Sequence, residues 1–174
     1  MKRMNLKVLL FAAIAFASIG TANAQNTQDI NITAIVPSIC IVDVSSETTM
    51  IFGMGNLGDA SNVDDFDATT TLAWRCSDGF NTIITISAGI SGDQTNRELD
   101  DGGTRLSYNL YTDATYLTVW GDGGLGTGTV AANGTGMAVG NIGNSVVYGR
   151  IPLAAAEAAP PGTYNDTVIV TVVL

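Results

Sequence analysis

The chain has 174 residues, with 16 acidic and 7 basic side chains, 2 cysteines and no histidine. The absence of histidine excludes imidazole-dependent catalytic triads and acid–base pairs, and two cysteines alone make a poor zinc site. A formal net charge of −9 argues against electrostatic binding of nucleic acid, and the length predicts one domain.

Residues 1–24 have the organisation of a secretory signal peptide. A basic start and a short apolar core precede Ala22-Asn23-Ala24, which forms a small-x-small cleavage site. Cleavage before Gln25 leaves four arginines, no lysine and sixteen acidic residues, a formal net charge of −12. Because the apolar run is too short to anchor in a membrane, we expect an exported protein.

Residues 25–36 alternate apolar with polar side chains, and Ile35 alone breaks the pattern. The side chains expected on the apolar face are those of Ile30, Ile32, Ala34 and Val36. Such alternation predicts a β-strand with one dry face. A strand at the start of the exported chain is free to move. It therefore either serves as an ordinary first strand of its own sheet or adds to the sheet of another subunit.

The remaining residues predict an antiparallel β-sandwich or barrel, because short runs rich in β-branched and aromatic residues alternate with Gly, Asp and Asn clusters. Strands are predicted over residues 39–44, 50–52, 69–75, 81–87, 105–111, 116–120, 145–153 and 163–174. The strands 105–111 and 116–120 are predicted to form a hairpin. Loops are expected over 59–67, 89–103 and most of 121–143, and residues 154–159 are expected to form a short helical connection.

Cys40 and Cys76 are the two cysteines, and each lies in or at the end of a predicted strand. An even number of cysteines in an exported protein predicts a disulfide, and only one pairing is possible. In the chain-entropy model, closing this loop stabilises the fold by roughly 4 kcal/mol.

The last predicted strand, residues 163–174, is the longest apolar one. One of its two faces carries Val168, Val170, Val172 and Leu174. We expect its outer edge to be uncovered, which is an aggregation hazard for a monomer. The alternating segment 25–36 of another copy has the pattern needed to cover it.

Acidic and aromatic clusters are the candidates for a binding or catalytic site. The acids around 64–67 and 100–101 do not fit the spacing of an EF-hand loop and are expected to be solvated turn residues. The glycine-rich stretch 121–126 lacks the lysine of a phosphate-binding loop, and no carboxylate pair stands out for glycoside hydrolysis. Four aromatic residues, Tyr108, Tyr111, Tyr116 and Trp120, would suit a sugar platform, although cross-strand packing is the commoner arrangement. We expect no enzyme and no cofactor or metal, with a monomeric sugar- or calcium-binding module as an alternative.

Four short motifs and the two cysteines stand in a characteristic order. The motifs are Tyr108-Asn-Leu-Tyr111-x-Asp113 followed by Trp120-Gly121-Asp122, then Val147-Tyr148-Gly149-Arg150-Ile151, and finally Pro161-Gly162-x-Tyr164-x-Asp166-x-Val168. Together they resemble the spore coat protein U domain family over essentially the whole exported chain. That family includes subunits of archaic, Csu-type chaperone–usher pili as well as secreted coat proteins.

The resemblance implies an all-β, incomplete immunoglobulin-like sandwich over residues 37–174 that lacks its last strand. A periplasmic pilus chaperone would lend a strand until the outer-membrane usher exchanges it for residues 25–36 of a neighbouring copy or related subunit. Carried over by position, the inserted donor side chains are Ile30, Ile32, Ala34 and Val36, and the strand flanking the acceptor groove carries Val168, Val170, Val172 and Leu174. A disulfide between Cys40 and Cys76 would brace the sandwich.

The resemblance further implies a structural pilus subunit at the cell surface, with a role in surface adhesion and biofilm formation. Tip adhesins of this type resemble two-domain proteins, so a single domain favours a shaft or minor subunit. A secreted coat or matrix protein of the same fold is the alternative within the family.

Overall fold

The computed structural model describes residues 28–43 and 45–174, and the chain divides into two units between Ile35 and Val36. The predicted signal peptide and the first residues of the alternating segment lie outside the described residues. Residues 28–35 are exposed and form no regular secondary structure. Because a strand exists through hydrogen bonds to a partner strand, the alternating pattern alone does not produce one in a single chain.

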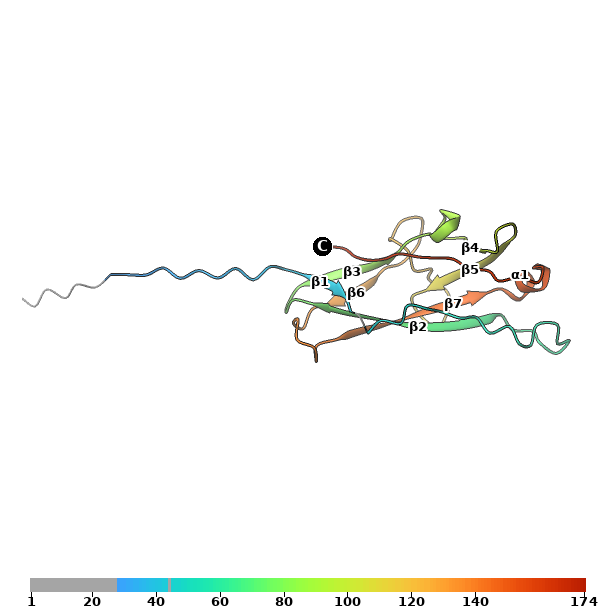
Figure 1. The fold of residues 1–174 in the computed structure, drawn as a ribbon, viewed down its shortest axis with the longest axis horizontal. Helices are drawn as coiled ribbons and strands as arrows, with labels where there is room; N and C mark the ends of the chain where they lie inside the picture. Colours follow the sequence, from blue (N-terminus) through green and yellow to red (C-terminus); the bar gives the residue numbers. More distant parts are fainter. Residues whose placement is uncertain (1–27, 44) are drawn as a thin grey trace, which may run out of the picture. The chain divides into compact units, whose positions relative to one another are not determined.

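Among the described residues, the strands of the second unit form two antiparallel sheets (Figure 1). The first sheet has the order β1-β2-β7-β5-β4, with β1 at Cys40–Val42, β2 at Phe66–Cys76, β7 at Gly143–Ile151, β5 at Arg105–Tyr111 and β4 at Arg97–Asp100. The second sheet has the order β6-β3-β8, with β6 at Val130–Asn133, β3 at Asn81–Ile86 and β8 at Val170–Val172. We refer to them as the five-stranded and the three-stranded sheet.

The inward faces of both sheets supply one hydrophobic core. Its fully buried members include Ile84 and Ile86 of β3, Ile151 of β7 and Trp120. Removal of this apolar surface from water is the main force that holds the two sheets together. The predicted all-β sandwich is therefore confirmed. In the described part of the chain, no helix combines the length and the apolar character needed to cross a bilayer.

Two strands lie in stretches for which loops were predicted. β4 carries three charged residues in four positions, and β6 contains two alanines, so neither has a strong strand signal of its own. β4 forms because β5 offers it an edge, and β6 forms because β3 does. The short elements η1, at Gly89–Ser91, and α1, at Leu153–Ala158, lie in connections, the second as predicted.

Two predicted strands are absent from the described residues. Residues 116–120 make only isolated bridges, because β5 is already flanked by β4 and β7 along most of its length and Tyr116 has a left-handed backbone with φ 55°. Residues 50–52 form no strand either. Met50 and Phe52 nevertheless pack against the core while Ile51 is exposed, so the predicted alternation is preserved without a hydrogen-bonded partner.

Candidate functional site: a groove between two sheet edges

The C-terminal segment passes from one sheet to the other. Asn165 exchanges two backbone hydrogen bonds of 2.9 Å with Asp100 of β4, whereas β8 pairs with β3 of the three-stranded sheet. Along the whole segment the side chains alternate, and the half-buried ones are those of Tyr164, Asp166, Val168, Val170 and Val172. One face of this segment is therefore directed at the core, with the parity that the sequence predicts.

The backbone of this segment has one satisfied side and one open side. Ser87 N–H donates to the Ile169 carbonyl (2.9 Å) and Val173 N–H donates to the Ile83 carbonyl (3.0 Å). In an antiparallel ladder the intervening residues direct their backbone groups to the opposite edge, and here these are Val168, Val170 and Val172. β8 ends the three-stranded sheet, so among the described residues no strand pairs with that edge.

The edge of the five-stranded sheet faces this open side. β1 pairs with β2, and Asp43 N–H continues this register by donating to the Ala73 carbonyl (2.7 Å). After a turn in which Ser46 N–H donates to the Asp43 carbonyl (3.0 Å), Glu47 N–H donates to the Thr71 carbonyl (2.9 Å) in a register shifted by two residues. The residues after β1 therefore also run along β2.

Between the two edges lies a groove of about 440 Å³. One wall is formed by residues 46–50 with Val42 and Phe52, and the other by residues 166–168 with Val170. The floor consists of buried core side chains, those of Leu72, Ile86, Leu110 and Val147. An extended peptide in this groove would pair its backbone with β8 and bury alternate side chains on the floor.

The residues assigned from the sequence to groove and donor segment lie as follows. Val168 and Val170 line the groove, and Val172 packs partly buried against the core, whereas Leu174 is 76% exposed. In the N-terminal segment, Ile30, Ile32 and Val36 are more than 80% exposed, at 81%, 91% and 85%, and Ala34 is exposed as well.

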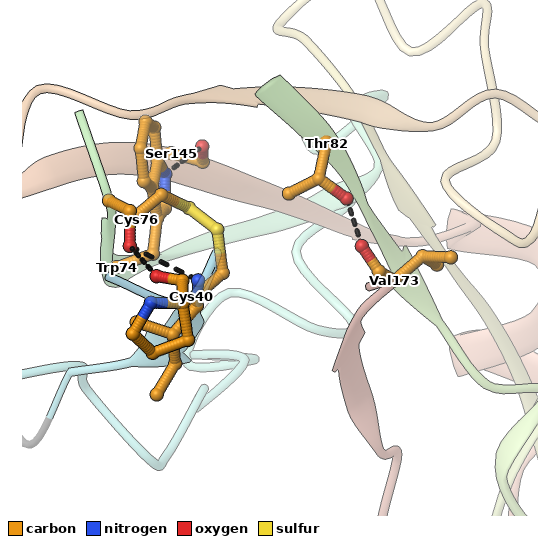
Figure 2. The surroundings of a disulfide bond; sticks show 9 residues. Cys40, Trp74, Cys76, Thr82, Ser145 and Val173 are labelled. Atoms are coloured by element: carbon orange, nitrogen blue, oxygen red, sulfur yellow. Dashed lines mark hydrogen bonds between the residues drawn. A yellow bond between two sulfur atoms is a disulfide. The ribbon is translucent and has the colours of Figure 1, made fainter. Parts of the chain in front are cut away.

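The predicted disulfide between Cys40 and Cys76 is confirmed, and it joins directly opposite residues of β1 and β2 (Figure 2). Both cysteines are buried, and the neighbouring Trp74 donates its indole N–H to the hydroxyl of Ser145 (3.2 Å). The bridge fixes the short edge strand β1 and thereby one wall of the groove.

Ser77 holds the residues that precede β1. Its backbone N–H donates to the Ile39 carbonyl (2.8 Å), and its hydroxyl oxygen accepts a hydrogen bond from Ile39 N–H (3.1 Å). The same hydroxyl donates to the Pro37 carbonyl (3.1 Å). The chain is therefore fixed from Pro37 onward.

At one end of the groove, the motif residues Tyr108 and Asp166 form a hydrogen bond of 2.6 Å, in which the Tyr108 hydroxyl donates. The other carboxylate oxygen of Asp166 accepts from Ile90 N–H (2.9 Å) and from Thr167 N–H (2.7 Å). A Cβ at residue 89 would collide with this carboxylate, and Gly89 also has a φ of 68°, so glycine is required there. The pKa of Tyr108 is raised well above its usual range. Burial of the hydroxyl is the main cause, and the hydrogen bond to Asp166 is the second.

Arg97 is a buried residue that the sequence analysis did not identify. It is 0% exposed and donates to the carbonyls of Ser87 (2.8 Å) and Trp120 (2.8 Å) and to the side-chain oxygen of Asn109 (2.7 Å). Burial lowers its pKa. The guanidinium ties β4 to the end of β3 and to the segment of Trp120, whose indole N–H donates to the Ile84 carbonyl (3.0 Å). One arginine among four gives no sequence signal of such a role.

The four aromatic residues considered as a sugar platform do not lie together: Tyr108 bonds to Asp166 and Trp120 is buried in the core. Only Tyr111 and Tyr116 pack in a cluster with Arg150. The Arg150 guanidinium lies 3.6 Å from the centre of the Tyr116 ring and donates twice to Asp67, at 2.7 and 2.8 Å. The Tyr116 ring makes edge contacts with Tyr111 (5.3 Å) and Tyr148 (6.3 Å). The hydrogen bonds from Arg150 lower the pKa of Asp67. The charged and aromatic groups of this cluster therefore bind one another.

The other motif residues serve turns and close contacts. Asp113 accepts a hydrogen bond from Thr115 N–H (2.8 Å), Gly121 N–H donates to the Gly128 carbonyl (2.9 Å), and the Tyr164 hydroxyl donates to the Pro160 carbonyl (2.8 Å). The other two motif glycines lie so close to neighbouring side chains that a Cβ would collide with them. A Cβ at Gly149 would lie 2.7 Å from the Phe52 ring, and one at Gly162 would lie 2.8 Å from the Asp101 carboxylate.

The acidic clusters act as turn and ion-pair residues. Asp65 accepts from Leu153 N–H (2.9 Å), and Asp101 accepts from Thr104 N–H (2.7 Å) within its own turn. Across residues 28–43 and 45–174, no group of three or more acidic or cysteine side chains is placed to hold a metal ion.

Comparisons with known proteins agree with this arrangement. A family model described as Spore Coat Protein U domain matches residues 26–171. Protein U of Myxococcus xanthus is 30% identical over 174 residues, covering 91% of this chain and 89% of that protein.

Among solved structures, the fold resembles a chain in the pre-assembly complex of CsuC with CsuE, a chaperone and a tip adhesion subunit from the archaic chaperone-usher Csu pili of Acinetobacter baumannii. The TM-score is 0.52 at 22% identity, and the match covers 79% of this chain but only 40% of that one. The likeness confirms the predicted immunoglobulin-like fold.

Proposed function

The chain belongs to the spore coat protein U domain family, and from this we propose that it is a structural subunit of an archaic chaperone–usher pilus that polymerises by donor-strand exchange. In this proposal residues 25–36 of one copy enter the groove of the next copy or of a related subunit. A periplasmic pilus chaperone occupies the groove beforehand, and the outer-membrane usher hosts the exchange. The protein is exported to the periplasm and then displayed on the cell surface, where it contributes to adhesion and biofilm formation.

The observation that carries the proposal is the groove between β8 and the edge of the five-stranded sheet. It combines an apolar floor with a backbone edge, at Val168, Val170 and Val172, that no strand of the described residues pairs with. A strand that enters it needs apolar side chains at every second position. Residues 30–36 have them, and they are exposed in the single chain.

The energetics of such a joint favour a long-lived polymer. Each inserted apolar side chain contributes about 1–3 kcal/mol on burial, and the donor segment supplies four of them together with a row of backbone hydrogen bonds. The joint can open only by losing most of these contacts together, so its lifetime is governed by a slow unfolding rate.

The connection between donor segment and domain supports exchange between copies over self-completion. Residues 37–39 are held by Ser77, and Cys40 is held by its disulfide. For residues 25–36 to fold back into their own groove, the chain would have to reverse its direction next to this fixed stretch. Little free chain is present there for such a turn.

We propose a purely structural role, without catalysis, for this chain. Charged and aromatic side chains that would be candidates for a reactive site pair with one another, as Asp67 does with Arg150 and Asp166 with Tyr108. A secreted coat protein of the same fold is the second candidate, favoured by the match to the family model described as Spore Coat Protein U domain. Electron microscopy of cells with and without the gene separates the two, because only the pilus subunit predicts thin surface filaments that disappear on deletion.

The proposal is tested with the exported protein on a denaturing gel, unheated and boiled. The expected result is a ladder of multimers that boiling converts to monomer and that is absent when residues 25–36 are deleted. The deleted chain should remain bound to its co-expressed chaperone, which shows that it folds. A single monomer band in both lanes from the full-length protein, soluble without a chaperone, contradicts the proposal and favours a self-complete binding module.

A further inference from the structure

The outer face of the three-stranded sheet carries no charged side chain in any of its described strands. Ile83 and Thr85 of β3 lie on this face, with Thr171 of β8 opposite Thr85 and Ala131 of β6 opposite Ile83. Just outside the bounds of β8, Ile169 and Val173 share the parity of Thr171. The exposed fractions of Ile83, Ile169 and Val173 are 39%, 66% and 41%, so the face is open and largely β-branched.

The outer face of the five-stranded sheet is different. There Arg150 pairs with Asp67, and Arg105 lies 3.5 Å from Glu98 and 3.6 Å from Asp100. The predicted exported chain has sixteen acids against four arginines. Two copies therefore repel each other wherever carboxylates meet, and a face without carboxylates allows the approach of a second copy at the lowest electrostatic cost.

The last residues of the donor segment extend this uncharged face, whereas Asp29, which has the same parity further toward the N-terminus, carries a carboxylate. If Ile32, Ala34 and Val36 point into the groove, the alternation of a strand places Thr33 and Ile35 on the outer side, next to the outward side chains of β8. Ile35 is the residue that breaks the apolar–polar alternation of the segment. Its apolar character has no role in the groove, whereas on the outer face it enlarges the β-branched surface.

We infer that the outer face of the three-stranded sheet, widened by the donor strand, is a contact surface for a further copy of this chain, through which assembled subunits associate side by side. The inference rests on the proposed function, because the added strand is part of the surface. This contact lies outside the groove, so a substitution on the face alters the association of polymers without altering the donor–acceptor joint.

The test compares exported wild-type protein with the variants Ile35→Asp and Ile169→Asp. Val146→Asp is the control, because Val146 is likewise an exposed β-branched residue, 39% exposed against 66% for Ile169, but lies on β7 of the other sheet. The heat-labile ladder on an unheated gel reports the joint, and the fraction of polymer that pellets at low speed, with electron microscopy of bundles, reports side-by-side association.

We expect all four proteins to keep the ladder, and both variants on the face to lose at least fivefold in pelletable polymer while Val146→Asp stays at the wild-type level. Unchanged bundling in both Ile35→Asp and Ile169→Asp, with the ladder present, overturns the inference and leaves the proposed function intact. Wild-type polymer that never associates side by side also overturns it. The inference is likewise overturned if Ile169→Asp releases the chaperone from the subunit, because the face is then a binding surface for the chaperone. Loss of the ladder from wild-type protein overturns the proposed function together with the inference.

Discussion

The two sheets of the sandwich differ in the interactions that stabilise each of them. The five-stranded sheet has a disulfide at one edge, a paired Arg150 at its centre and a paired Arg105 near its other edge. The three-stranded sheet has no ion pair among the described residues, and its edge strand β8 has only three residues. The difference indicates that the first sheet is braced within the chain, whereas the second ends in a short strand whose edge is suited to another strand.

Removing the disulfide is expected to be the largest single perturbation of the five-stranded sheet. Replacing both cysteines, as Cys40→Ser with Cys76→Ser, should lower the free energy of unfolding by roughly 4 kcal/mol, because the unfolded chain regains the freedom of the closed loop. Urea unfolding of the chaperone-released subunit measures the change. A loss below about 1 kcal/mol would contradict a bracing role for the bridge.

Arg97 connects the two sheets, and its replacement by methionine should cost about 2–4 kcal/mol. The Arg97→Met substitution leaves the buried Trp120 carbonyl and the part-buried Ser87 carbonyl without their charged donor. Arg105→Met is the matched control, because Arg105 is partly exposed and exposed ion pairs contribute about 0–1 kcal/mol. Equal losses in the two variants would contradict the connecting role.

Tyr108→Phe should cost about 1–2 kcal/mol, because it removes the donor to the Asp166 carboxylate and leaves the ring in place. Hydrogen exchange should show the loss at Ile90 and Thr167, whose N–H groups donate to the same carboxylate. Tyr164→Phe provides the comparison, because Tyr164 lies in the C-terminal segment two residues before Asp166 and donates its hydroxyl to the Pro160 carbonyl instead. Uniform deprotection of the whole domain would contradict a local role at the end of the groove.

The smallest expected effect is a pH dependence from Asp67. Its pKa in the folded protein is lowered by the hydrogen bonds from Arg150, so its contribution is present above the unfolded pKa of about 3.9 and is lost as the pH falls through the folded value. Discounted for solvent screening, it amounts to less than about 1 kcal/mol. Asp67→Asn should therefore reduce the difference in unfolding free energy between pH 7 and pH 3. Asp64→Asn is the control, and an equal reduction there would contradict the assignment.

The features that could be predicted from the sequence are those with a local signal. The alternation in the last strand, the two cysteines and the turn residues identify the sandwich, its disulfide and its uncovered edge. β4 and β6 could not be predicted, because their strand state depends on the neighbours β5 and β3. Arg97 was missed for the same reason, since its partners come from three separate segments that only the fold brings together.

Direct completion of the groove by a peptide tests the central claim. The subunit without residues 25–36, released from its chaperone, is mixed with a synthetic peptide of residues 25–36, and its Tm is measured. A peptide at one hundred times its Kd stabilises by about 2.7 kcal/mol, which for a domain of this size raises the Tm by roughly 5–10 °C.

We expect this rise for the wild-type peptide and for Asn31→Asp, whose substituted side chain faces outward. We expect no rise for Ile32→Asp, whose carboxylate would enter the apolar floor. Equal shifts with all three peptides, or none with any of them, would contradict donor-strand completion of the groove.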